Sequence, residues 1–267
     1  MLKKLFLVVF CVLISSKTLQ ADNYVIANYK TRFIEEKGGN PFQRQSPCST
    51  FKIPLAIIGF QENYLLDNNA PVCDYKEGYT NWIPIWEQSF TPFTWMQKSC
   101  VWYSQEIIAK PYGQERLQQF VENFKYGNMD ASGTNENYDY SFSWLNSSLQ
   151  ISPREQINFL FKLLDRGYGA TENIYQKVEN IIPQEDLING WVLHGKTGTS
   201  YFWNEDGSWD KRKQMGWYIG WIEKYRQKYV FAYAINEMDT DPNLSAGLTA
   251  KQRIKEKLEA FILKWNL

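Results

Sequence analysis

Residues 47–58 constrain the fold and function of this chain more than any other stretch, because a proline leads directly into a long apolar run. Pro47 interrupts the structure before it, and a serine after such a break is a preferred helix start. In that helix Ser49 and Lys52 lie three residues apart on one face. Free backbone N–H groups at a helix start favour a developing negative charge. A hydroxyl and an amine in this setting indicate an activated serine nucleophile.

The Ser-x-x-Lys pattern is weak by itself, because average composition produces it about once in a chain of this length. A second copy, from Ser208 to Lys211, lies in the polar run 204–213, which is typical of a loop. The first copy therefore gains its meaning only from motifs further along the chain.

The first 21 residues have the features of a secretory signal peptide. Lys3 and Lys4 precede the unbroken apolar run 5–14, and Ala21 ends a small-residue cleavage site. Because this run is too short to span a membrane comfortably, we expect cleavage near Ala21, export to the periplasm and no membrane contact by the mature protein. Residues 22–267 are predicted to form a single catalytic domain, since a chain of this length can bury one sizeable core.

The charge and cysteine content of residues 22–267 argue against several partners. Loss of the three lysines in the signal leaves 26 basic against 29 acidic residues, a net charge of −3, whereas nucleic-acid binding usually shows a basic excess. The sequence has no zinc-ligand spacing and no Gly-rich phosphate loop. Cys48, Cys73 and Cys100 are odd in number, so at least one thiol is free. The sequence predicts neither their redox state nor an oligomeric state.

The hydrophobic pattern predicts strands at both chain ends and helices between them. Short strands are expected at 24–26 and 32–34, and longer ones at 191–197, 217–222 and 229–235. Helices are expected from Ser49 to near Gly59, over 114–124, after a capping box at Ser152, and over the stripe 254–265. This order predicts an α+β fold (an α/β sandwich). Its central antiparallel sheet is built from both chain ends, with an inserted helical lobe. A ligand cleft is expected between the two lobes.

His194 is the only histidine, so a Ser-His-Asp mechanism would have to use it. It lies two residues before Lys196 in a strand-like stretch, where alternation puts both side chains on one face. A lone histidine in a strand is more often a packing residue than a base. A serine enzyme of this sequence is therefore expected to use a lysine as its base.

Further motifs follow Ser49-Thr50-Phe51-Lys52 in order along the chain. They are Ser99-Cys100-Val101-Trp102, Tyr126-Gly127-Asn128, Trp144-Leu145 and Lys196-Thr197-Gly198. Ser-x-x-Lys and Lys-Thr-Gly are among the marks of penicillin-recognising serine enzymes. On these motifs, residues 47–235 most closely resemble the class D, oxacillinase-type serine β-lactamases. The resemblance implies the fold of that group, hydrolysis of small β-lactam substrates and antibiotic resistance, with Tyr126-Gly127-Asn128 mainly structural.

The resemblance also implies how the substrate is bound and attacked. Ser49 would attack the β-lactam carbonyl and form an acyl-enzyme, and the backbone N–H groups of Ser49 and Thr199 would form the oxyanion hole. Ser99 would relay a proton towards the departing ring nitrogen. Lys196 and Thr197 would bind the substrate carboxylate.

The role implied for Lys52 is that of a general base carboxylated on its side-chain nitrogen by carbon dioxide. An ordinary lysine, with a pKa of about 10.4, is a poor base at neutral pH. Burial beside Phe51, Val101 and Trp144 would favour the neutral amine that captures carbon dioxide. Trp144 would donate its indole N–H to the carbamate, Val101 would keep the pocket dry, and Gly198 would let a backbone come close. No metal and no other cofactor is expected.

The sequence departs from the family near the last helix, where members usually place an arginine for the substrate carboxylate. Ser245, Thr249 and Arg253 are the alternatives here, so substrate preference stays open. Other functions are a penicillin sensor that stays acylated, a penicillin-binding transpeptidase, and a silent exported module that binds cell-wall glycan or peptide. The lone short apolar segment disfavours the sensor, and Ser99-x-Val101 with a short chain disfavours the transpeptidase.

Overall fold

The computed structural model describes residues 22–133, 139–204, 209–239 and 244–267, so the expected signal peptide lies outside the described residues. Its centre is an antiparallel sheet in the order β2-β1-β6-β5-β4-β3. The strands are β1 (Asn23–Asn28), β2 (Ile34–Gly38), β3 (Gln184–Asp186), β4 (Val192–Trp203), β5 (Trp209–Lys224) and β6 (Gln227–Asp239). Because β1 pairs with β6, the sheet joins both ends of the chain, which confirms the predicted fold class.

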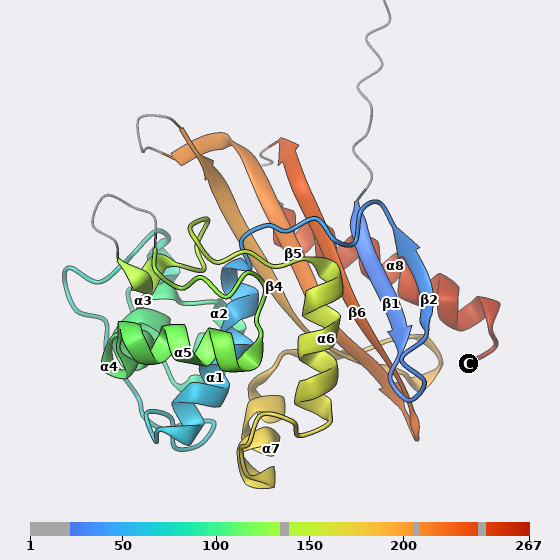
Figure 1. Cartoon of the computed structure of the whole chain (residues 1–267), viewed down its shortest axis with the longest axis horizontal. Helices are drawn as coiled ribbons and strands as arrows, with labels where there is room; N and C mark the ends of the chain where they lie inside the picture. The colour runs from blue at the N-terminus through green and yellow to red at the C-terminus, as the bar shows by residue number, and fades with distance from the viewer. Residues whose placement is uncertain (1–21, 134–138, 205–208, 240–243) are drawn as a thin grey trace, which may run out of the picture.

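Helices fill most of the chain between β2 and β3 and pack on one face of the sheet, while α8 covers the other face (Figure 1). The helical elements are η1 (Cys48–Phe51), α1 (Lys52–Gln61), η2 (Pro84–Trp86), α2 (Pro92–Lys98), α3 (Val101–Tyr103), η3 (Ser104–Ala109), α4 (Lys110–Tyr112), α5 (Gln114–Phe124), η4 (Tyr140–Phe142), α6 (Pro153–Leu164), α7 (Glu172–Ile181), η5 (Ile188–Gly190) and α8 (Ala246–Lys264).

Alternation along the strands gives the sheet two apolar faces, each with its own core. Trp217 and Ile219 face the core shared with the helices between β2 and β3. Tyr218 and Ile222 face the core shared with α8. The predicted capping box opens α6, where Ser152 and Glu155 exchange side-chain to backbone hydrogen bonds. The first core thus holds the helical layer against β5, the neighbour of the strand that carries the Lys-Thr-Gly motif.

Two local predictions were wrong in part. The strand predicted at 32–34 begins only at Ile34, the first residue of β2, because the Asn28 side chain accepts from the backbone N–H groups of Lys30 and Thr31 and closes a turn just before it. The polar run 204–213 is not simply a loop, because β5 starts at residue 209 and Lys213 pairs with Asp239 of β6. Strand β3 and helix α7 were not predicted from the sequence. Strand β3 has only three residues, which is too few to show an alternation of apolar and polar side chains.

Candidate active site

A cleft of about 690 Å³ lies where the helical layer meets β4. Five predicted site residues line it: Ser49, Ser99, Val101, Thr197 and Thr199. They come from η1, from the α2–α3 junction and from β4, segments that are far apart in the sequence. The fold therefore brings the three separate motifs to one surface.

Ser49 lies in the first turn of a helix that continues into α1, as the sequence predicts. Thr50 caps this turn by donating from its backbone N–H and its hydroxyl to the Pro47 carbonyl. Cys48, just before the serine, has a φ of 51°, in the left-handed region that residues with a side chain rarely adopt. Ser49 is 8% exposed, and that exposure is towards the cleft. Strained backbone beside a serine at a cleft is typical of a functional site.

The amine of Lys52 is buried, and no hydrogen bond within the described residues compensates for its burial. The residue is fully buried, and its Nζ has no hydrogen-bond partner in the described part of the chain. The Nζ lies 6.0 Å from the centroid of the Trp95 ring. Burial lowers the pKa of Lys52 to about 7. The neighbouring thiols of Cys48 and Cys100 do not neutralise it at neutral pH, because burial raises the pKa of each to about 12.

Trp144 lies next to this turn and is also fully buried. Its ring stacks on Phe51 with 5.3 Å between centroids. Its carbonyl accepts from the backbone N–H of Cys48 at 2.9 Å and from the hydroxyl of Ser46 at 2.8 Å. Its indole Nε1, like the Lys52 amine, has no partner among the described residues. Buried polar groups without partners cost free energy, and their presence in a native protein calls for an explanation.

Lys196 joins β4 to the helical layer. Its Nζ donates to the hydroxyl of Ser99 and, at 3.0 Å, to the carbonyl of Thr197. Ser99 itself has a φ of 56° at the end of α2. Lys196 is buried, and burial, aided by the positive charge of Lys52, lowers the pKa of Lys196 well below its ordinary value. A second lysine of the site is thus held away from its charged form.

Gly198 permits close contact between β4 and the turn that carries Ser49. A Cβ added to Gly198 would lie 3.0 Å from the Pro47 oxygen and 3.3 Å from the Ser49 nitrogen. The next residue, Thr199, accepts from the backbone N–H of Gly247 at 3.0 Å, which fixes β4 to the first turn of α8. The backbones of Ser49 and Thr199 therefore meet at the same part of the cleft.

Of the three alternatives for a carboxylate ligand near α8, Ser245 is the one that lines the cleft. Its hydroxyl accepts from the N–H of Leu248 at the start of α8. Thr249 donates to the Ser245 carbonyl at 3.2 Å. Arg253 forms an ion pair with Asp22 at 2.6 Å and lines a different hollow with Tyr233. Arg253 is thus engaged elsewhere.

The sequence reasoning missed an aromatic and aliphatic wall of the cleft, formed by Trp82, Ile83 and Trp86. Trp82 and Ile83 are 46% and 44% exposed, and the Trp82 ring packs at a tilt of 45° against Trp86, with 6.1 Å between centroids. The high aromatic content between residues 79 and 95 is the one signal in the sequence that could have indicated this wall.

Other singled-out residues lie outside the cleft. His194 stacks on Trp221 at 4.8 Å, and its Nε2 lies 3.0 Å from a Glu223 oxygen, in keeping with a packing role. Asn128 bonds to Ser148 and Gln150 and braces a loop. All three cysteines of the described chain are free. No group of three or more metal-ligand side chains is placed to hold a metal within the described residues.

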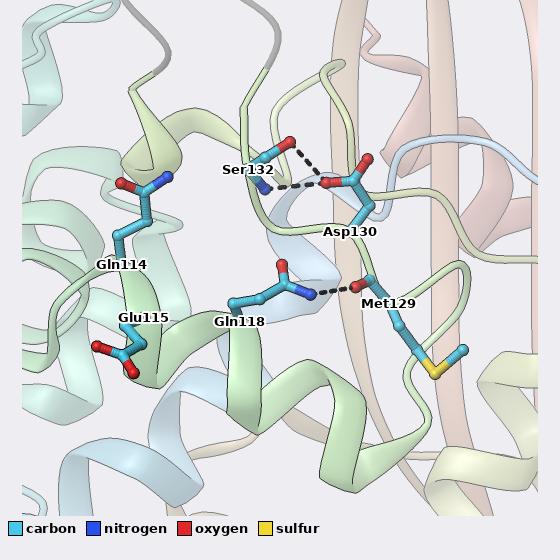
Figure 2. Close-up of a pocket in the computed structure, with 6 residues that line it drawn as sticks. All are labelled: Gln114, Glu115, Gln118, Met129, Asp130 and Ser132. Atoms are coloured by element: carbon cyan, nitrogen blue, oxygen red, sulfur yellow. Dashed lines mark hydrogen bonds between the residues drawn. The ribbon is translucent and has the colours of Figure 1, made fainter.

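A second hollow, of about 670 Å³, lies between α5 and the segment around Met129 (Figure 2). Gln118 donates to the Met129 carbonyl at 2.8 Å, and Asp130 accepts from the N–H and hydroxyl of Ser132. None of the predicted site residues lines it. The chemistry indicated by the motifs therefore belongs to the cleft at Ser49.

Comparison with known proteins identifies the family. Residues 40–258 match the family model of the penicillin binding protein transpeptidase domain. The chain is 36% identical to Beta-lactamase OXA-9 of Klebsiella pneumoniae over 212 residues, covering 78% of this chain and 76% of that protein. Beta-lactamase OXA-1 of Escherichia coli is 36% identical over 233 residues, covering 84% and 76%. The crystal structure of the OXA-427 class D β-lactamase superposes with a TM-score of 0.82 at 36% identity, covering 91% of this chain and 99% of that one. On its motifs, its fold and these relatives, the chain belongs to the class D serine β-lactamase family.

Proposed function

We propose that this protein hydrolyses β-lactam antibiotics, and so confers resistance to them, through an acyl-enzyme on Ser49 with carboxylated Lys52 as general base. The assignment of the reaction follows from the family. The assignment of roles rests on the residues that meet at the cleft.

In the first half of the reaction, the Ser49 oxygen bonds to the β-lactam carbonyl carbon as its proton leaves, and the carbon–nitrogen bond of the ring then breaks. The backbone N–H groups of Ser49 and Thr199 stabilise the developing oxyanion. The contact between Lys196 and the Ser99 hydroxyl supports a proton path to the departing ring nitrogen. In the second half, water attacks the ester, which releases the opened product and restores Ser49.

One observation carries the assignment of the base: two buried groups, the Lys52 amine and the Trp144 indole N–H, have no partner in the described chain. With a pKa of about 7, Lys52 is partly neutral at neutral pH and able to react with carbon dioxide. A carbamate on Lys52 would supply anionic oxygens that accept a proton from Ser49 or from water. The Trp144 N–H would then donate to it. Family membership implies no metal cofactor.

The pairing of two buried lysines has a consequence for substrate binding. The positive charge of Lys52 contributes to keeping Lys196 neutral. Conversion of Lys52 from cation to anion reverses that interaction and favours the protonated form of Lys196. Protonated Lys196, with the hydroxyls of Thr197 and Ser245, is then suited to the carboxylate of a β-lactam.

The test is hydrolysis of a chromogenic cephalosporin by the wild type, Ser49→Ala and Lys52→Ala, with Gln118→Met as a control outside the cleft. We expect repeated turnover by the wild type and the control, and at least a 10³-fold loss of kcat in the other two variants. A sensor would acylate once and stop, and a binding module would not react. Substantial turnover by Ser49→Ala would overturn the proposal.

We further propose that residues 22–267 form one catalytic domain that is exported to the periplasm after removal of residues 1–21. The basic start and short apolar run of that segment support this. Within the described residues, no helix has the length and apolar character needed to cross a bilayer. N-terminal sequencing of protein from a periplasmic extract should begin within a few residues of Asp22; an intact start at Met1 would contradict it.

A further inference from the structure

Gln105 has a buried side-chain amide and belongs to none of the active-site motifs. It is 1% exposed and lies on η3, a π-helical segment that follows the Ser99-Cys100-Val101 motif. π-helical turns are rare and occur frequently at functional sites. Burial of a polar side chain costs free energy unless hydrogen bonds compensate for it, so the bonds of Gln105 show what it holds.

The Gln105 amide holds the segment that leads to Trp144. Its Nε2 donates to the Ser141 carbonyl at 3.1 Å and lies 3.4 Å from the Ser141 hydroxyl, and Ser141 is fully buried. Turn hydrogen bonds from Ser143 to Tyr140 and from Leu145 to Phe142 continue from Ser141 through Trp144. The Ser141 carbonyl thus belongs to the same hydrogen-bonded segment that carries Trp144.

Trp144 is consequently held from two sides. On one side its carbonyl accepts from Cys48 and Ser46, which ties it to the turn of Ser49. On the other side Gln105 ties the preceding turn to the helix that follows Ser99. These two anchors meet at a ring whose N–H is buried and has no partner in the described chain.

We infer that Gln105 is a positioning residue, which sets the Trp144 indole N–H so that it favours carboxylation of Lys52. The inference rests on the proposed carboxylation. It predicts that loss of the Gln105 amide weakens retention of carbon dioxide by Lys52 while leaving Ser49, Ser99 and Lys196 in place.

The test compares wild type, Gln105→Met and Gln118→Met after decarboxylation at low pH, with activity measured against added bicarbonate. Methionine keeps the length of the side chain and removes the amide donor. Gln118 is the matched control, because its amide also donates to a backbone carbonyl (Figure 2) but lines a different hollow from the cleft at Ser49. We expect Gln105→Met to need about tenfold more bicarbonate for half-maximal activity, the change expected for one lost hydrogen bond, and to regain kcat at saturating bicarbonate. Gln118→Met should match the wild type.

A second readout is the carbamate signal of Lys52 in ¹³C NMR spectra with labelled bicarbonate, which does not depend on turnover. If the wild type shows neither dependence on bicarbonate nor this signal, the proposal that carboxylated Lys52 is the base is overturned, independently of the result for the Gln105 variants. A wild type with both, matched by Gln105→Met at every bicarbonate concentration, would defeat this inference alone. If Gln105→Met does not fold, Gln105→Asn, which keeps the amide but shortens its reach, makes the same comparison.

Discussion

At the scale of single residues, Lys52 is kept in an environment that opposes its charge. Its pKa in the folded protein is about 7, against an ordinary value of 10.5. Between these two pH values the unfolded chain binds more protons at this residue than the folded one, so the contribution of Lys52 to stability rises with pH. Below pH 7 the Lys52 amine is protonated in both the folded and the unfolded state, and burial of its charge then destabilises the fold to the full extent.

Lys52→Met should therefore be more stable than the wild type at pH 6 in bicarbonate-free buffer, by a few kcal/mol. The advantage should shrink as the pH is raised towards 10, because the wild-type amine then loses its proton in the unfolded state as well. Urea denaturation of both proteins at several pH values measures this difference. A difference that does not change with pH would show that packing, not charge, is responsible.

The three candidates near α8 are also distinguished one residue at a time. Ser245→Ala should raise KM for a penicillin severalfold with little change in kcat, because it removes a hydroxyl from the cleft wall. Arg253→Met should leave KM unchanged, because Arg253 is paired with Asp22 outside the cleft. The KM values of the two variants, measured by steady-state kinetics, distinguish Ser245 from Arg253 as the ligand of the substrate carboxylate. A raised KM in Arg253→Met with an unchanged KM in Ser245→Ala would indicate Arg253 instead.

At the scale of elements, the contact between β4 and η1 depends on Gly198. Gly198→Ala would put a methyl group 3.0 Å from the Pro47 oxygen and 3.3 Å from the Ser49 nitrogen. Separation of the two elements should cost about 1–3 kcal/mol of stability and lower kcat/KM at least tenfold. Gly167→Ala is the control, because its methyl group would also be crowded, by the Lys162 side chain at 2.7 Å and the Lys162 backbone oxygen at 3.2 Å, but outside the cleft; it should keep full activity. Thermal melts and kinetics test both; unchanged activity in Gly198→Ala would argue against this contact as part of the site.

The sequence predicted elements with strong local signals and failed where tertiary contacts decide. The capping box at Ser152 and the helix 114–124 were predicted correctly because caps and helical periodicity are local. The start of β5 was missed because its polar residues are held by pairing with β4 and, from Lys213 on, with β6. Motif order brought out Ser49, Ser99 and Lys196, but no local pattern indicates that Gln105 reaches the turn before Trp144.

At the scale of the whole molecule, the site depends on segments from very different parts of the chain. Ser49 and Lys196 lie on η1 and β4, whereas Ser99 and Trp144 lie in the connections that follow α2 and η4. The motif around each of them is a weak signal by itself. Their convergence depends on the sheet, in which β4 pairs with β5, β5 with β6, and β6 with the first strand. The helical layer is thereby closed against β4 at the cleft.

The pairing of β1 with β6 also determines when the sheet can be completed. Val25 lies opposite Ala232, so more than 200 residues separate the first strand from its partner along the chain. Contacts of such long sequence separation slow folding. A chain that is exported before it folds should therefore depend on protection from proteases and aggregation until β6 has also emerged.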